Sequence, residues 1–305
     1  MNSSATTGSF TVMPDQADRR LDRVLRGLYR DIPLGAIMKA IRKGNVRLNG
    51  AKTSVDARLS RGDIVSTPWD TPVQTHLSKP AAGLEKKLVT LFRNDDLWCV
   101  DKPAGLLSRP DKAGGDSVIT RAWEILGWNR QDFRPALIGR LDRNASGVEA
   151  IAMNAPALRA LSEATRNGNI NKIYAAVVRG DAPDEGEIDF PLIKDTRKNI
   201  VRTARPGEKG LFAFTRFKKL SGNGRYSLLE VNLVTGRSHQ ARVHLASAGY
   251  PIAGDIKYGP RETGGVRRVM LHAQKISFSP DARLPDGLRG LEIVSPLPDN
   301  FGRMS

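Results

Sequence analysis

The sequence YSLLEVNLV at residues 226–234 is rich in residues that favour β-strands. An earlier run of the same kind, KIYAAVV at residues 172–178, precedes it, and no helical pattern separates the two. Parallel neighbours in a sheet need a long crossover, which is usually a helix, whereas antiparallel neighbours do not. These runs therefore favour a mainly antiparallel sheet over a doubly wound parallel one.

The rest of the C-terminal part supports this interpretation. Further strands are expected at VTLF (89–92), at LWCV (97–100) and within residues 269–278. Helical patterns of apolar residues lie near residues 117–127, 156–166 and 239–248. We predict an α+β domain at residues 88–305, built on a mainly antiparallel mixed sheet.

The N-terminal part predicts a second, smaller α/β domain at residues 18–66. Apolar residues recur at helical spacing in two short segments, first at Leu21, Val24, Leu25 and Leu28 and then at Ile37, Met38 and Ile41. Asn49 and Gly50 then separate two extended runs, which is typical of a two-residue hairpin turn. We expect residues 1–17 to be a flexible N-terminus and the proline-containing residues 67–87 to be a linker.

The charge of the chain indicates a polyanionic partner. Lys and Arg number 48 against 32 Asp and Glu, which leaves a net charge of +16. Twelve of these cations lie between Arg19 and Arg61, where only three acids occur. Solvated helix faces could carry the same charges, but a bias shared by two helices favours a surface that binds RNA phosphates. The candidate RNA-binding residues are Arg20, Arg23, Arg26, Lys39, Arg42, Lys43 and Arg47.

Several other classes of protein are disfavoured. No apolar run of about 20 residues is present, so we expect no membrane partner. Cys99 is the only cysteine, and the three histidines after it lack metal-ligand spacing, so we expect no disulfide within the chain and no metal site. The sequence contains no phosphate-binding loop, so we expect no nucleotide cofactor. The first residues do not resemble a targeting signal, and we expect a cytoplasmic protein.

Four stretches carry the chemical information when they are taken together. GRLDRNASGVEAIAMN (139–154) places a carboxylate among cations, which alone would indicate a surface ion pair. The other three are VDKPAGLLSRP (100–110), NKIYAAVVRG (171–180) and VTGRSHQARVHLASAGYPIAGDIKYG (234–259). With these four in this order, the chain resembles the RluA family of pseudouridine synthases. The segments at 20–50 and 58–65 resemble an S4-type RNA-binding domain.

The resemblance implies an isomerase that detaches uracil from ribose, turns it, and joins its C5 to the same ribose carbon, without a cofactor. It implies that Asp142 is the nucleophile, and that Arg242 pairs with this carboxylate, for which a bidentate contact is suited. It also implies that Tyr174 stacks on the uracil and acts in deprotonating C5. Arg140 is the candidate for the side chain that fills the space left by the flipped base.

Two further positions are candidates for substrate binding. Leu271 matches an apolar position that packs under the base, although a Leu in a strand is ordinarily a core residue. Arg237 is a second cation that either fixes its turn or binds phosphate. The chain departs from the family pattern at Gly139, Asn144 and Ala145, where the family commonly has His, Asp and Thr. Within the family, the RKGNVRLNG run at residues 42–50 and the overall order look closest to members that act on large-subunit ribosomal RNA, so the resemblance implies 23S ribosomal RNA as the substrate. We expect the enzyme to act as a monomer.

Two alternatives remain open at this point. A non-catalytic RNA-binding factor in ribosome assembly would explain the charge equally well, but it gives no reason for an acid beside cations. The second alternative is a nucleotide-dependent enzyme, which would need a phosphate-binding loop that this sequence lacks. A third ambiguity concerns residues 195–210, a basic segment expected to form a mobile loop that either contacts RNA or is solvated.

Overall fold

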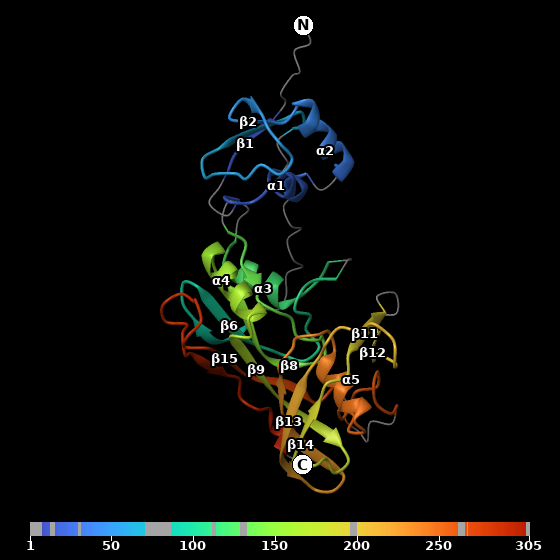
Figure 1. The fold of residues 1–305 in the computed structure, drawn as a ribbon. Helices are drawn as coiled ribbons and strands as arrows, with labels where there is room; N and C mark the ends of the chain where they lie inside the picture. The colour runs from blue at the N-terminus through green and yellow to red at the C-terminus, as the bar shows by residue number, and fades with distance from the viewer. Residues whose placement is uncertain are drawn as a thin grey trace. The chain divides into compact units, whose positions relative to one another are not determined.

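The computed structural model divides the chain into two compact units (Figure 1). One comprises Met1–Glu85 with Trp128–Arg134, and the other comprises Lys86–Gly127 with Pro135–Ser305. The structure describes residues 8–12, 16–29, 32–70, 87–111, 114–128, 133–195, 200–261, 266 and 268–302. In these residues no helix is both long and apolar enough to cross a membrane.

The small unit contains two helices and a four-stranded antiparallel sheet in the order β1-β4-β2-β3. Its elements are β1 (Gly8–Thr11), α1 (Leu21–Leu28), α2 (Leu34–Lys43), β2 (Arg47–Leu48), β3 (Ala51–Lys52) and β4 (Ile64–Thr67). Asn49 and Gly50 both have positive φ, 50° and 79°, so the predicted hairpin turn is present. The buried faces of both helices pack with Val46 and Val65 in one apolar core.

Two parts of the expected domain organisation are wrong in detail. Residues 8–11 are not a flexible terminus, because β1 pairs with β4 along its whole length. Thr67 is not yet linker, because it is buried in β4 and its hydroxyl contacts the hydroxyl of Tyr29 at 2.8 Å. A sequence without strong apolar alternation gave no signal for this edge strand. Most of the expected linker, residues 71–86, lies outside the described residues.

Among its described residues, the large unit holds a ten-stranded mixed sheet and four helices. Its helices are α3 (Val118–Ile125), α4 (Ala155–Arg166), α5 (Gln240–Ser247) and α6 (Asp299–Gly302). Its strands are β5 (Val89–Arg93), β6 (Leu97–Lys102), β7 (Ala136–Leu137), β8 (Ser146–Ala152), β9 (Ile170–Arg179), β10 (Glu185–Ile188), β13 (Thr215–Gly222), β14 (Tyr226–Leu233), β15 (Leu271–Phe278) and β16 (Glu292–Val294). A separate two-stranded sheet consists of β11 (Leu192–Asp195) and β12 (Ile200–Thr203).

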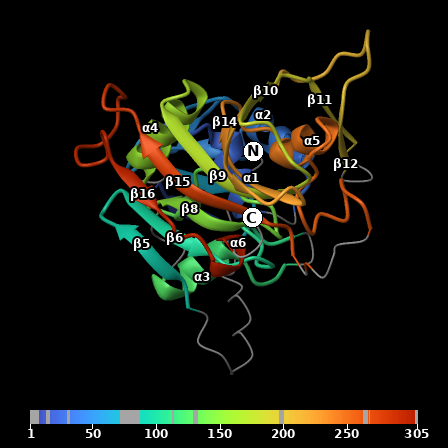
Figure 2. The same cartoon turned by 90° about the horizontal axis from the view of Figure 1, so that it is seen from below.

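The main path of the large sheet runs β10-β13-β14-β9-β15-β8-β6-β5. Figure 2 shows β6, β8, β15 and β9 side by side in its centre. Every neighbouring pair is antiparallel except β15 with β8. The expected α+β class with a mainly antiparallel mixed sheet is therefore confirmed.

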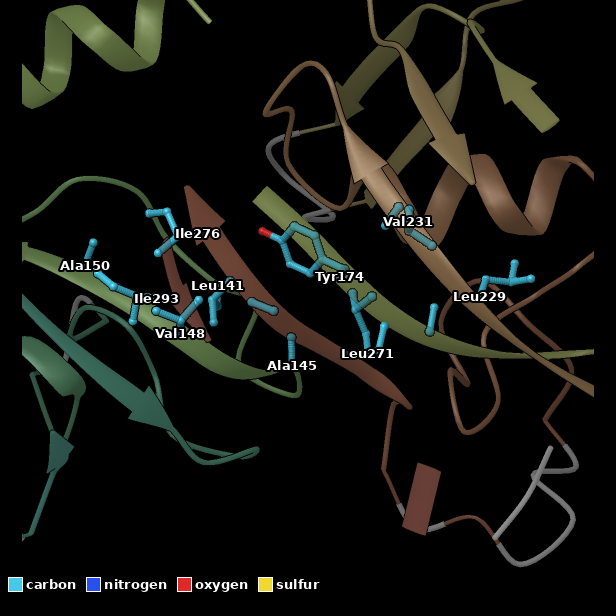
Figure 3. Packing of buried hydrophobic residues seen from close by; sticks show 14 of the residues in the cluster. Leu141, Ala145, Val148, Ala150, Tyr174, Leu229, Val231, Leu271, Ile276 and Ile293 are labelled. Carbon is cyan, nitrogen blue, oxygen red and sulfur yellow. The ribbon is translucent and has the colours of Figure 1, made fainter. Parts of the chain in front are cut away.

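The central strands are buried because both faces of the sheet are covered. β8 is buried at all seven positions, and β9 at six consecutive positions from Ile173 to Val178. Figure 3 shows side chains of this core, with Tyr174 and Leu271 among them. Fully burying one such aliphatic side chain contributes about 1.5–3 kcal/mol. The core thus gives β8 and the turn before it a rigid base.

Gly147 permits the single parallel contact of the sheet. Its φ of 110° is strained for any side chain, and a Cβ at this position would lie 2.2 Å from the backbone oxygen of Ala273 on β15. Ala273 is also its partner in the parallel register. The close approach of β8 and β15 therefore requires glycine here.

We predict that Gly147→Ala lowers the free energy of unfolding by more than about 2 kcal/mol, because a backbone clash adds to an unfavourable φ. Gly224→Ala is the matched control, since Gly224 has a φ of 80° but open space around its Cβ position. Urea denaturation of both variants measures the difference. Equal losses would show that the approach of β8 to β15 adds nothing to the strain at φ.

Candidate active site

The large unit contains an open cavity of about 1290 Å³ whose wall includes Asp142. Among the described residues of its lining, eight Lys or Arg side chains stand against three Asp side chains. No group of three His, Cys, Asp or Glu residues in the described ranges could hold a metal ion. The cavity thus presents a carboxylate to solvent in a strongly cationic setting, which suits an anionic substrate.

Asp142 lies in the turn before β8, and Arg242 on α5 donates to it. The distance from Nη1 of Arg242 to Oδ2 of Asp142 is 3.0 Å. The Asp142 side chain is 25% exposed, whereas that of Arg242 is 8% exposed. The predicted pairing is present in the structure, and it joins residues 100 positions apart in the sequence.

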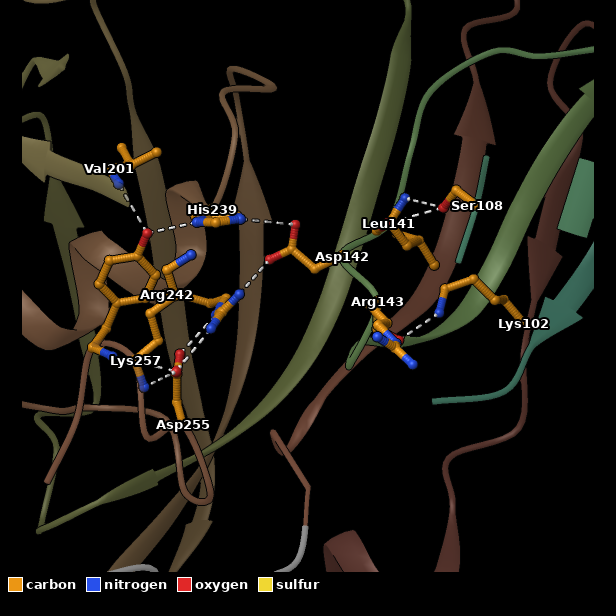
Figure 4. A network of polar contacts seen from close by, with 11 residues as sticks. Lys102, Ser108, Leu141, Asp142, Arg143, Val201, His239, Arg242, Asp255 and Lys257 are labelled. Carbon is orange, nitrogen blue, oxygen red and sulfur yellow. Dashed lines mark hydrogen bonds and ion pairs between the residues drawn. The ribbon is translucent and has the colours of Figure 1, made fainter. Parts of the chain in front are cut away.

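Arg242 makes its bidentate contact with Asp255. The sequence had suggested a bidentate contact with Asp142, to which Arg242 donates only one hydrogen bond. Nε and Nη2 of Arg242 donate to the two carboxylate oxygens of Asp255 at 2.7 and 2.8 Å (Figure 4). Asp255 is almost fully buried. One planar guanidinium therefore serves two carboxylates, with the inner one fixing its orientation and the outer one lying in the cavity wall.

The charges of this group are mutually stabilising. Burial alone would lower the pKa of Arg242, but its hydrogen bonds and charge interactions with Asp255 and Asp142 raise it above the usual value. The arrangement thus places one guanidinium between two carboxylates where solvent is partly excluded.

The second oxygen of Asp142 faces His239 without a hydrogen bond. Its Oδ1 lies 3.8 Å from Nε2 of His239, while Nδ1 of the same ring contacts the hydroxyl of Tyr258 at 2.5 Å. Burial lowers the pKa of His239 more than Asp142 raises it, so the imidazole is neutral near pH 7. His239 also has a φ of 54°, a left-handed conformation rare for residues other than glycine. Such strain is found most often at functional sites.

Lys102, at the end of β6, fixes the turn that carries Asp142. This lysine is fully buried, and its ammonium donates to the backbone oxygens of Pro103, Leu106 and Arg143 at 2.8–3.1 Å. Burial lowers its pKa to about 8, although the charges of Glu149 and Asp142 oppose the shift. Lys102 therefore connects the DKPAG stretch to the residue that follows Asp142.

Ser108 provides a second connection between the same two segments. Its hydroxyl donates to the backbone oxygen of Leu141 at 2.9 Å and accepts from the backbone nitrogen of Leu141 at 3.0 Å. Gly105 and Arg143 add a third, through their backbones at 2.8 Å. Residues on both sides of Asp142 are therefore held by one loop, which restricts the directions in which its carboxylate can point (Figure 4).

The other predicted residues fall into two groups. Arg140 and Arg237 are exposed and line the cavity, and Nε of Arg237 donates to the backbone oxygen of Phe212 at 2.9 Å. Tyr174 and Leu271 instead lie in the apolar core and are at most 7% exposed. Burial, followed by the charges of Asp142 and Glu149, raises the pKa of Tyr174 far above its usual value. Its phenol therefore stays protonated.

Sequence reasoning missed several residues that build this site. Lys102 and Ser108 lie in the stretch 100–110, and Asp255 and Tyr258 lie in the stretch 234–259, so the motifs contained the signal without showing which contacts they make. Arg268 lines the cavity and donates to the hydroxyl of Ser146 at 3.0 Å. No pattern in the sequence distinguishes this arginine from other surface cations.

Comparison with known families identifies the class of the protein. Residues 96–247 match the family described as RNA pseudouridylate synthase. This range includes the turn of Asp142, the strand of Tyr174 and the helix of Arg242. The chain belongs to the RNA pseudouridylate synthases of the RluA type and is an RNA pseudouridine synthase, as the motifs predicted.

Individual relatives agree with this assignment over most of the chain. The chain is 33% identical to the ribosomal large subunit pseudouridine synthase C of Haemophilus ducreyi, with 90% of this chain and 88% of the relative covered. Identity is also 33% to the proteins of that name in Vibrio cholerae, covering 97% and 96%, and in Escherichia coli K12, covering 88% and 87%.

Solved structures confirm the fold alone. The human RNA pseudouridylate synthase domain containing 1 superposes with a TM-score of 0.57 at 20% identity, covering 70% of this chain and 85% of the other. The human RNA pseudouridylate synthase domain containing 4 gives a TM-score of 0.56 at 23% identity, covering 70% and 90%.

We predict that Lys102→Met lowers both stability and the rate of a single turnover. The change leaves buried backbone oxygens without a donor, at a cost of roughly 1–3 kcal/mol for each unsatisfied group, and releases the turn of Asp142. Lys275→Met is the control, because Lys275 makes an exposed ion pair with Glu292 that contributes about 0–1 kcal/mol. Urea denaturation and single-turnover assays at saturating RNA measure both effects. A Lys102 variant that behaves like the control would remove the lysine from this role.

Proposed function

We propose that this enzyme isomerises specific uridines in large-subunit ribosomal RNA, the 23S RNA, with Asp142 as the nucleophile. The observation that carries the proposal is the carboxylate of Asp142, which contacts the Arg242 guanidinium at 3.0 Å in the wall of a cationic cavity. The names of the curated relatives support the choice of RNA. A pure phosphate-binding factor would gain nothing from an acid placed among cations.

The geometry supports a division of labour between the two oxygens of Asp142. Oδ2 accepts the hydrogen bond from Arg242, and Oδ1 makes no hydrogen bond to His239 at 3.8 Å, so Oδ1 is the oxygen that attacks the ribose carbon. The bond between this carbon and N1 of uracil breaks as the bond to Oδ1 forms. The bond to Oδ1 breaks in turn when C5 of the turned uracil bonds to the same ribose carbon, which frees Asp142. C5 loses a proton and N1 gains one, so the reaction is an isomerisation that needs no cofactor.

The base must leave the RNA stack before it can reach Asp142. Arg140 is exposed on the cavity wall two residues from Asp142, and its planar guanidinium is suited to occupy the vacated position. Tyr174 and Leu271 lie in the apolar core, and the charge of Asp142 acts on the phenol of Tyr174. We assign both side chains an apolar contact with the uracil. The raised pKa of Tyr174 disfavours its expected part in taking the C5 proton, because a neutral phenol is a poor base.

The small unit is assigned to RNA binding, as an S4-like domain. Six of its seven candidate cations are exposed, and the exception, Arg20, makes an ion pair with Asp22 at 3.1 Å. The exposed six are Arg23, Arg26, Lys39, Arg42, Lys43 and Arg47. We further propose that the enzyme acts as a monomer in the cytoplasm, where ribosomal RNA is available.

We predict that Asp142→Asn keeps RNA binding and eliminates product, because the amide is nearly isosteric but cannot act as the nucleophile. Pseudouridine is mapped in ribosomal and transfer RNA from cells that lack the gene and from cells that express either form. We expect cells that lack the gene to lose pseudouridine at sites in large-subunit RNA. The original gene should restore these sites, and the Asp142→Asn variant should not. Substantial restoration by Asp142→Asn would contradict the mechanism, and sites confined to transfer RNA would contradict the substrate.

We predict that replacing Arg42, Lys43 and Arg47 together by Gln weakens RNA binding and flattens its dependence on salt. Each phosphate contact that is lost should reduce the slope of log affinity against log salt by about 1. The single-turnover rate at saturating RNA should be unchanged, since the chemistry lies in the other unit. Titrations at several salt concentrations test this, with Lys275→Gln as the control for an exposed cation elsewhere. An unchanged slope would exclude these cations from the RNA interface.

A further inference from the structure

Phe212 is an exposed aromatic residue of the large unit. It is 60% exposed, as is its neighbour Leu211, whereas Ala213 is fully buried. The segment therefore exposes the adjacent side chains of Leu211 and Phe212, while Ala213 anchors it in the core. Exposed large apolar side chains that are held in place often mark a binding surface.

Phe212 follows a pair of hydrogen-bonded strands. Residues 195–210 were expected to form a mobile loop, but Asp195 belongs to β11 and residues 200–203 form β12, and residues 196–199 lie outside the described residues. β11 pairs with β12, and the backbones of Leu192 and Leu211 exchange two hydrogen bonds at 2.8 and 2.9 Å. Leu192, Val201, Ala213 and Val243 form a small apolar cluster that packs this sheet against α5. Figures 1 and 2 both show β12 beside α5, the helix that carries Arg242.

One hydrogen bond connects Phe212 to the catalytic cavity. Its backbone oxygen accepts from Nε of Arg237, which lines the cavity together with Lys194 of β11. Arg237 is fixed in turn because its backbone nitrogen donates to the side chain of Gln240 at 2.9 Å. The backbone of Phe212 therefore contacts a residue of the wall of the cavity that holds Asp142.

Phe212 also begins a row of planar side chains. Its ring stacks with that of Phe214 at a centroid distance of 6.4 Å and an interplanar angle of 25°. The guanidinium of Arg216 lies 5.0 Å from the centroid of Phe214 on the same row. Flat rings beside cations suit nucleobases joined by phosphates, because each base offers a face for stacking and each phosphate a negative charge.

We propose that Phe212 is a stacking platform for an unpaired RNA base that flanks the target uridine. The inference rests on the proposed function and deepens it, since it places a nucleotide beside the one that enters the cavity. The cavity and its rim are cationic, which fits an RNA strand and not an apolar protein partner. A base drawn out of the stack leaves neighbours that need new contacts, and an aromatic ring supplies them.

The test compares ring and non-ring side chains at position 212 in the full-length protein. Binding is measured with an unmodified large-subunit ribosomal RNA transcript and proteins that also carry Asp142→Asn, and single-turnover rates are measured with Asp142 intact. Stacking predicts that Phe212→Ala and Phe212→Leu each weaken binding about 5- to 100-fold, while Phe212→Trp retains it. The dependence of affinity on salt should be unchanged, because no charge is removed.

Leu220→Ala is the matched control, because Leu220 is 51% exposed on β13 and lies outside the lining of the cavity. It should bind RNA as the unsubstituted protein does. If Phe212→Leu binds RNA as tightly as Phe212→Trp does, stacking is overturned in favour of a simple apolar contact. Unchanged binding in Phe212→Ala would overturn the platform altogether.

The remaining outcomes separate this proposal from the proposed function. If the unsubstituted protein makes pseudouridine while Phe212→Ala binds and reacts normally, only the platform is overturned. If the unsubstituted protein neither binds nor modifies the RNA, the substrate assignment fails and the platform fails with it. Self-association that is lost in Phe212→Ala with RNA affinity intact, measured by sedimentation, would assign the surface to a second copy of the chain and overturn the proposal.

Discussion

The guanidinium of Arg242 is the interaction on which the site depends, because it is shared by two carboxylates of different burial. Asp255 is buried and takes two of its nitrogens, and Asp142 borders solvent and takes the third. A buried charge without a partner costs several kcal/mol. The ion pair with Asp255 therefore allows the charged side chain of Arg242 to be buried in the cavity wall. Nη1 of Arg242, which does not bind Asp255, then orients Asp142. The pair of Arg242 with Asp255 is therefore structural, and the pair of Arg242 with Asp142 belongs to the proposed chemistry.

The opposite side of Asp142 is supported by a separate part of the chain. Lys102 and Ser108 hold the backbone on either side of the carboxylate, and neither contacts Arg242 through any hydrogen bond in the described residues. The sheet supplies the common base, since β8 begins directly after this turn and is buried throughout. Placement from two directions suits the proposed role of Asp142 as nucleophile, because small errors in the position of a nucleophile cost large factors in rate.

Much of this arrangement could be predicted from the sequence, and the remainder could not for physical reasons. The strand runs and the Asn49-Gly50 turn follow from local patterns, whereas the pairing of Asp142 with Arg242 was implied by the resemblance to the RluA family. The two bonds from Arg242 to Asp255 depend on the side-chain packing of α5 against a loop, which no spacing encodes. The pairing of β1 escaped prediction for a similar reason, since an edge strand needs little apolar alternation.

The most direct test is a double-mutant cycle between Asp255 and Arg242, read as the single-turnover rate at saturating RNA. Circular dichroism confirms the fold of each variant. Asp255→Asn should lower the rate strongly in the presence of Arg242, and should have little further effect once Arg242→Met has been made, because Asp255 acts only through that guanidinium. Rate losses that multiply in the double variant would show that Asp255 and Arg242 act independently, and would contradict the account.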